Sequence, residues 1–339
     1  MSKILINLAV LISLISYWIT DQKEIEIELL YNINQDVESA PLLGQIVDAE
    51  FDSNENLYLL DGDRMKIHMY DSEGIFQNSF GREGRGPGEF TGLGGGLFFD
   101  ENQNQICTID YRGARIVCYS IEDKSQHYTI NLQSTTTVRT NGLILFRSKK
   151  LLLGSHQNVN SFIHQISSDG ITNYSFGDFI NFESFIHNNS GKLQLSQVVA
   201  SKYNGYLLVS SVAPNINKVF DDSLNLIYEH QDNLLPKPWE THMIMEPNRY
   251  RSSFYSMAVA NQILSKEEYL YTWSEVVDEE IPEVIFHLEL RKLENGEVIS
   301  EKKIGKNYIL GMQRLTDSSA LLLLRNNKQN YEVHKVSIN

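Results

Sequence analysis

The chain has 339 residues, of which 42% are hydrophobic and 21% charged, a composition typical of a globular protein. Its net charge of −14, without any cluster of Lys and Arg, argues against a nucleic-acid partner. Its 17 tyrosines and 15 phenylalanines favour strands over helices. The length is compatible with two domains or with one large β architecture, so the decision rests on the pattern along the chain.

Residues 1–20, MSKILINLAVLISLISYWIT, differ from the rest of the chain. The run 4–19 is almost wholly apolar, which is long for a signal-peptide core and slightly short for a membrane span. No cysteine follows the run, so a lipid-modified cysteine is excluded. We interpret 1–20 as an export signal, either cleaved or kept as a membrane anchor; the alternative is a buried element of the main fold. We expect residues 21–339 to form a single exported domain, periplasmic, at the cell surface or anchored through this segment.

Internal repeats organise the next part of the chain. Residues 66–81, KIHMYDSEGIFQNSFG, align without gaps with FIHQISSDGITNYSFG at 162–177. A copy between them is visible when ENLYLLDGDRMKIHMYD at 55–71 is aligned with NQICTIDYRGARIVCYS at 104–120. Each copy alternates apolar and polar residues on both sides of a turn, which predicts a β-hairpin with one buried face. The copies are about 48 residues apart, the length of one four-stranded propeller blade.

The stretch FGREGRGPGEF at 80–90 holds four glycines and a proline. A P-loop would need Gly-Lys-Ser/Thr followed by a helix, and the dinucleotide-binding glycine pattern also needs a helix, which GEFTGLGGGLFF does not offer. We therefore interpret 82–89 as the crossing between the first and second blades. The alternative is a ligand contact by Arg82 or Arg85, whose guanidinium groups suit carboxylates and phosphates.

Cys107 and Cys118 are the only cysteines, and they occupy the two strands of one predicted hairpin. The hairpin is centred between Arg112 and Gly113, so its register places the two cysteines directly opposite each other. Such neighbours have Cβ atoms within about 5.5 Å, which a disulfide can span with little movement. An exported protein would favour the bridge. Two reduced cysteines packed as small apolar groups are the other reading, and the sequence does not decide between them.

The stretch 233–256, NLLPKPWETHMIMEPNRYRSSFYS, interrupts the alternation. Long insertions in compact β folds often carry function, and Trp239, His242 and Arg251 are residue types suited to a binding rim. The alternative is a lid that packs over one end of the channel.

Weaker copies of the repeat follow at 205–230, 269–305 and 320–338, which gives six units. A seventh unit would require strands hidden in 231–256. The last unit is one strand short, whereas EIEIELLYNI at 24–33 alternates strictly and belongs to no unit of its own. This strand can pair as the outermost strand of the last blade and cover its edge. The sequence therefore predicts an all-β protein, a closed six-bladed β-propeller of four-stranded blades.

Two motifs resemble known propeller families. The pattern Asp, four residues, Lys or Arg, Ile, two residues, Tyr occurs at 61–70 and 110–119 and resembles the NHL repeat. FGREGRGPGEF is similar to the blade-joining signature of the six-bladed β-propeller proteins common in Bacteroidetes. The resemblance implies a six-bladed fold and an exported, cell-envelope location. Its relatives are often lipoproteins, from which this chain departs, and it implies no catalytic residue.

The predicted channel-lining strands are poor in catalytic groups. Asp48 and Glu50 lie on the first inner strand, and the other inner strands offer almost no carboxylate or histidine that could converge on a metal. The turns 52–56 and 100–104 are rich in oxygen ligands but lack the calcium-loop pattern, so we expect no cofactor, with Ca²⁺ as the alternative. His68 occupies the same repeat position as His164, which favours a structural role.

These patterns favour a non-enzymatic binding or interaction protein of the cell envelope. We expect a monomer that meets a small ligand or a protein partner on the face bearing 82–89 and 239–251, with Arg82, Arg85, Trp239, His242 and Arg251 as contacts. The alternative is an enzyme at the channel mouth, either a metal-assisted hydrolase similar to a lactonase or phosphatase, or a lyase.

Overall fold

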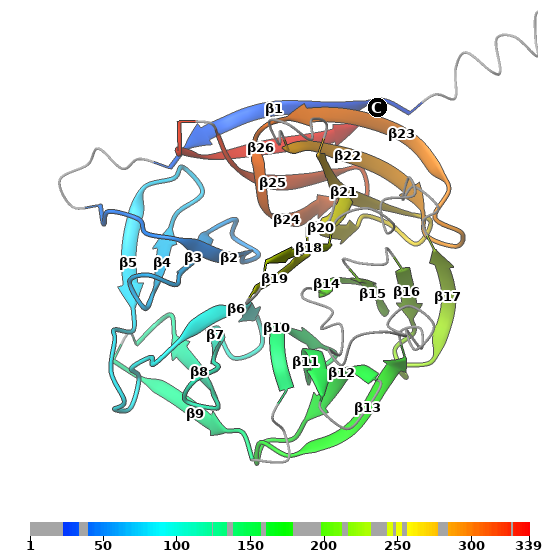
Figure 1. Cartoon of the computed structure of the whole chain (residues 1–339). Coiled ribbons are helices and arrows are strands. Elements are labelled where there is room, and N and C mark those ends of the chain that lie inside the picture. Colours follow the sequence, from blue (N-terminus) through cyan, green and yellow to red (C-terminus); the bar gives the residue numbers. More distant parts are fainter. Residues whose placement is uncertain are drawn as a thin grey trace, which may run out of the picture.

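The computed structural model describes residues 23–33, 40–123, 125–133, 138–156, 161–178, 198–211, 216–231, 243–246, 249–252, 256–276, 284–326 and 328–339. These residues form strands and turns, arranged as six four-stranded antiparallel sheets around a central axis (Figure 1). The prediction of a six-bladed propeller is confirmed. The interpretation of 1–20 concerns residues outside the described ranges. Within those ranges, no helix has the length and hydropathy needed for a membrane span.

Each blade is a meander whose strands follow one another from the channel outward. The strands of the first two blades are β2 (Ile46–Phe51), β3 (Leu57–Asp61), β4 (Lys66–Tyr70), β5 (Phe76–Phe80), β6 (Leu93–Asp100), β7 (Gln105–Asp110), β8 (Arg115–Ser120) and β9 (His127–Asn131). Those of the third and fourth are β10 (Val138–Phe146), β11 (Lys149–His156), β12 (Ser161–Ile166), β13 (Thr172–Asp178), β14 (Val198–Tyr203), β15 (Tyr206–Ser211), β16 (Ile216–Phe220) and β17 (Leu226–Gln231). Those of the fifth and sixth are β20 (Ser256–Ile263), β21 (Glu268–Val276), β22 (Val284–Lys292), β23 (Val298–Gly305), β24 (Tyr308–Thr316), β25 (Ser319–Arg325) and β26 (Tyr331–Ile338).

The sixth blade is completed by the N-terminal strand β1 (Ile25–Asn32), as predicted. β1 pairs antiparallel with β26, from Ile25 opposite Ile338 to Asn32 opposite Glu332. The two ends of the described chain therefore lie in one sheet, and the ring is closed by backbone hydrogen bonds (Figure 1). β1 thereby replaces β26 as the outermost strand, and the sixth blade has four strands like the others.

The hydrophobic core is divided among the junctions between blades. Six clusters of buried side chains occur in the described residues, and each draws its members from two neighbouring blades. One of them joins Leu57 and Leu59 of the first blade to Leu321 and Leu323 of the last. Burial of these apolar faces holds the ring together, because no single blade can bury both of its own faces.

The free inner edges of the blades are bonded by side chains from neighbouring blades. A channel-facing strand has unpaired N–H and C=O groups, and these need partners when they are buried. Asp48 of β2 accepts hydrogen bonds from the N–H groups of Gly96 (2.7 Å) and Leu97 (2.9 Å) on β6. Equivalent donations to carbonyl oxygens are made by Lys202 to Leu145 (2.6 Å), Asn261 to Val199 (3.2 Å) and Arg314 to Leu264 (2.6 Å).

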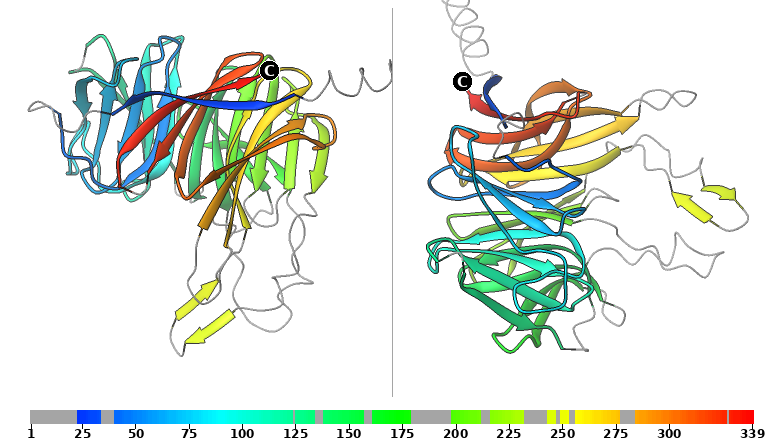
Figure 2. Two further views of the ribbon diagram at one scale, coloured as in Figure 1. Left: turned by 90° about the horizontal axis from the view of Figure 1, so that it is seen from above. Right: turned by 90° about the vertical axis from the view of Figure 1, so that its left-hand side faces the viewer.

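The meander gives the ring two different faces. One face, which we call the loop face, carries the crossings between blades and the connections between second and third strands. The other, which we call the turn face, carries the short connections between first and second strands and between third and fourth strands. The stretch 233–256 lies between the fourth and fifth blades in the chain, and within it the structure describes a two-stranded hairpin of β18 (Met243–Glu246) and β19 (Arg249–Ser252). Figure 2 shows this hairpin standing away from the ring, so it forms no seventh blade.

Candidate functional site

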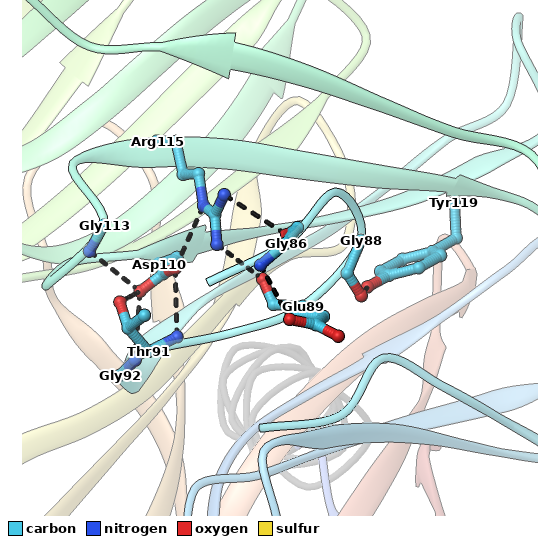
Figure 3. Close-up of polar contacts among 9 residues, drawn as sticks. All are labelled: Gly86, Gly88, Glu89, Thr91, Gly92, Asp110, Gly113, Arg115 and Tyr119. Carbon is cyan, nitrogen blue, oxygen red and sulfur yellow. Dashed lines mark hydrogen bonds and ion pairs between the residues drawn. The ribbon is translucent and has the colours of Figure 1, made fainter. Parts of the chain in front are cut away.

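The glycine-rich stretch 82–89 is fastened to the second blade by side chains of β8. Arg115 donates hydrogen bonds to the carbonyl oxygens of Gly86 (3.5 Å) and Glu89 (2.7 Å), and the Tyr119 hydroxyl donates to that of Gly88 (2.5 Å) (Figure 3). Gly81 has φ +79°, and a Cβ atom there would lie 2.2 Å from the ring of Phe90. The stretch connects β5 to β6, so it is the blade crossing that the sequence indicated.

Asp110 explains the spacing of the repeated motif. Its buried carboxylate accepts hydrogen bonds from Thr91 N (3.1 Å), Thr91 Oγ1 (2.7 Å), Gly92 N (3.0 Å), Gly113 N (3.0 Å) and Arg115 Nε (3.1 Å) (Figure 3). Asp110 and Arg115 face each other across the hairpin, which is why the motif places them five residues apart. One carboxylate thus bonds the turn to the incoming crossing, and the motif is structural.

The repeated histidines are also structural. His68 is fully buried, and its Nδ1 atom lies 2.8 Å from Ser79 Oγ on the neighbouring strand. His164 has the equivalent contact with Ser175 at 2.8 Å. The same His–Ser contact in two blades indicates a structural role rather than a ligand-binding role.

The predicted binding residues lie on the loop face where the structure describes them. Arg82 forms an ion pair with Glu89, at 2.7 Å between Nη2 and Oε1, while 76% of its side chain stays exposed. The Gly86 N–H and this guanidinium lower the pKa of the Glu89 carboxyl. Arg85 is exposed. Trp239 and His242 lie outside the described residues, and Arg251 is described only as a position on β19, so the predicted set stays a prediction.

A pocket of about 510 Å³ lies on the opposite, turn face. It is built where the inner strands of the second, third and fourth blades end in their first turns. Its walls are Phe99, Glu101 and Asn102 from the second blade, 145–148 from the third and 202–205 from the fourth. Leu145 and Phe146 are buried and form an apolar floor, whereas the buried Phe99 ring stacks on Tyr58 of the first blade. A concave apolar floor with a few polar groups at its rim is the usual form of a small-molecule site.

Three charged side chains line this pocket, and they differ in their partners. Glu101 accepts hydrogen bonds from Ser53, at 3.0 Å from its N–H and 2.8 Å from its hydroxyl. Arg147 makes a bidentate pair with Asp222, at 2.8 and 2.9 Å. Lys202 donates to a backbone carbonyl oxygen.

Two acids on β2 lie beside the channel behind this pocket. Burial raises the pKa of Glu50 to about 8, although the Lys202 ammonium opposes the shift. Burial also raises the pKa of Asp48, against the effect of its backbone hydrogen bonds. Among the described residues, no group of three or more His, Cys, Asp or Glu side chains could hold a metal ion.

No pattern in the sequence predicted this pocket. Its residues were seen as ordinary ends of inner strands and as turns, because three separate blades contribute to it. One signal was available: Asn204 and Gly205 are the residue types favoured in a two-residue hairpin turn, whereas the equivalent turn of the third blade has Arg147 and Ser148.

The fold and the repeated motifs define a six-bladed β-propeller. The chain belongs to the DUF5128 family, described as 6-bladed beta-propeller, which matches residues 38–236. None of the curated proteins matches it.

Solved structures with this fold include proteins of Bacteroides. A Bacteroides fragilis protein described as exported has 12% identity and a TM-score of 0.57, with 94% of this chain and 96% of that chain covered. A member of the DUF4221 family from Bacteroides vulgatus has 11% identity and a TM-score of 0.59, with 94% and 99% covered. The aldose sugar dehydrogenase of Streptomyces coelicolor in its PQQ-bound form has 9% identity and a TM-score of 0.53, with 93% and 99% covered. At these identities the similarity shows the fold alone.

Proposed function

We propose that the protein is a non-enzymatic binding protein of the cell envelope, and that its small-molecule ligand occupies the turn-face pocket. The observation that carries this proposal is the pocket itself, with its volume of about 510 Å³ and its apolar floor. Pockets of roughly 300–1,000 Å³ hold most small ligands. The envelope location is supported by the apolar segment 1–20 and by the fold shared with a Bacteroides fragilis protein described as exported. Enzymes also use this fold, so the proposal rests on the site and not on the architecture.

The ring supplies a rigid frame for such a site. Its pocket residues stand at the ends of strands that are bonded on one side by the sheet and on the other by neighbouring blades. A preorganised site needs little reordering when it binds, which favours affinity.

A matched pair of tryptophan substitutions tests the location. Asn102 lines the pocket, and its N–H bonds Asp100 Oδ1 at 3.1 Å. Asn54 occupies the same place in the first blade, where its N–H bonds Asp52 Oδ1 at 2.9 Å, and it does not line the pocket. Asn102→Trp should fill the pocket, whereas Asn54→Trp makes the same chemical change elsewhere on the turn face.

The readout is native mass spectrometry of the purified protein after incubation with a small-molecule extract of the source envelope. We expect a bound mass in the wild type, in Asn54→Trp and in Arg85→Ala, and its loss in Asn102→Trp. A bound mass that survives Asn102→Trp but is lost in Arg85→Ala would instead place binding on the loop face, with Arg82, Trp239, His242 and Arg251 as the next candidates.

A further inference from the structure

The charges of the turn-face pocket indicate which class of molecule it takes, an inference that rests on the proposed function. Glu101 is already engaged, because both of its carboxylate oxygens accept hydrogen bonds from Ser53 of the first blade. Its negative charge is therefore directed away from the pocket and toward the neighbouring turn. A cationic ligand would have to compete with these two bonds.

Arg147 is oriented but not saturated. Its Nε and Nη2 atoms each donate one hydrogen bond to Asp222, which is the usual bidentate arrangement. A guanidinium has five N–H donors, so this pair uses two of them. The remaining donors are free to meet a second acceptor, and more than half of the side chain is exposed.

Arg147 lies in a turn whose backbone conformation is unfavourable for its residue types. Arg147 and Ser148 have φ of +48° and +63°, the one place in the described residues where two consecutive non-glycine residues adopt the left-handed region. The equivalent turn of the fourth blade uses Asn204 and Gly205, which adopt that region readily. Such conformations cost about 1 kcal/mol or more each and cluster at functional sites. The turn thus places Arg147 at the pocket rim although its backbone conformation is strained.

Lys202 is the pocket cation that has no carboxylate partner. Its Nζ atom donates to Leu145 O at 2.6 Å, and no described carboxylate lies within ion-pair distance of it. Glu50 is half-buried, and its carboxyl faces Lys202, Asp48, Glu101 and the Phe99 N–H. Burial raises the pKa of Glu50 to about 8, against the effect of the Lys202 ammonium, and so disfavours a negative charge beside this cation.

We propose that the pocket binds a small organic acid, whose carboxylate pairs with Lys202 and reaches Arg147 while its apolar body lies on Leu145 and Phe146. One uncompensated cation suits a monoanion better than a phosphate dianion. The buried Leu145 and Phe146 side chains offer contact to a hydrocarbon or aromatic body.

Matched acids and amides test the class directly. Phenylacetate and hydrocinnamate, each beside its neutral amide, are titrated into the full chain by ligand-observed NMR at pH 7. Each acid should bind at least about tenfold more tightly than its amide, the difference that one charge-assisted hydrogen bond provides. Lys202→Gln keeps an N–H donor for Leu145 O and should bring acid and amide to equal affinity. Lys328→Gln, an exposed lysine outside the pocket, should leave the ratio unchanged.

The outcomes separate this inference from the proposed function. Equal affinities of acid and amide in the wild type, a preference that survives Lys202→Gln, or no binding of either acid would overturn the assignment of an organic acid. If acid and amide bind equally and Asn102→Trp blocks both, the pocket stands and only the class is wrong. If Asn102→Trp blocks neither, the proposed site is itself wrong.

Discussion

The guanidinium of Arg314 lies over the ring of Tyr203, 3.8 Å from the ring centroid, although the two residues belong to the sixth and fourth blades. Arg314 also donates through Nη2 to the Tyr203 hydroxyl at 3.0 Å, and through Nε to Leu264 O of the fifth blade at 2.6 Å. One side chain therefore connects three blades at the channel mouth. Because Tyr203 is also a wall of the turn-face pocket, the same contacts fix the shape of the proposed site.

Removal of this connection should weaken the ring. Arg314→Ala is expected to lower the free energy of unfolding by about 2 kcal/mol, through lost stacking, the lost hydrogen bonds to Leu264 and Tyr203, and the lost ion pair with the exposed Asp317. Arg314→Lys should restore less than half of the lost free energy of unfolding, since an ammonium cannot cover the Tyr203 ring and reach both acceptors. Urea unfolding measures the change, with Lys328→Ala as an exposed control. Equal stability of Arg314→Ala and the control would refute the role of this contact.

Asp110 should be among the costliest polar residues to replace. Asp110→Ala leaves the partly buried Arg115 without its carboxylate and four further donors without an acceptor, so we expect a loss of about 3 kcal/mol. Limited proteolysis should also reveal faster cleavage within 82–89. Asp123→Ala, at an exposed turn, serves as the control and should change stability little. If both variants unfold at the same urea concentration, the Asp110 carboxylate does not stabilise the crossing between the first and second blades.

Cys107 and Cys118 lie opposite each other in the register, as the hairpin pattern predicted, and they are bonded as a disulfide in the structure. The protein purified without reductant should therefore show no free thiol on alkylation and intact-mass analysis. The bridge closes a loop of sequence separation 11, so reduction or the double change to Ala should cost about 2–3 kcal/mol. Two alkylated cysteines in the unreduced, denatured protein would contradict the bridge.

The Glu50 carboxyl should make stability depend on pH. It keeps its proton in the folded protein up to about pH 8, whereas the unfolded chain loses it near 4.5. Between these values the folded state binds more protons, so the free energy of unfolding falls as the pH rises. The fall should amount to about 2 kcal/mol, less than the full shift implies because Glu50 is only half-buried. Glu50→Gln should flatten this slope in urea unfolding between pH 5 and 8, and an unchanged slope would show that another group is responsible.

The ring could be predicted from the sequence because its signals are local and repeated. Alternation, the Asp-to-Arg spacing and the turn at each Phe-Asp pair recur in successive blades, and 24–33 alternates without a unit of its own. The pocket has no such signal. Phe99, Leu145 and Lys202 each end a separate inner strand, and only closure of the ring brings them together.

The partners of the polar residues on the inner strands also could not be predicted from the sequence. Asp48 and Glu50 were noticed as acids, but their partners are backbone N–H groups of the next blade, which the sequence does not reveal. The glycine-rich stretch 82–89 could be recognised as a blade crossing, because a phosphate-binding loop would require a helix after it and the sequence shows none. That inference depends on local sequence alone.

A crystal structure of the protein purified from its native source, without exchange of bound small molecules, tests the central claim most directly. We predict ligand density on the turn face, over Phe146 and between Arg147 and Lys202. Ligand density beside Arg82 and Arg85 on the loop face, with the turn-face pocket holding solvent alone, would contradict it.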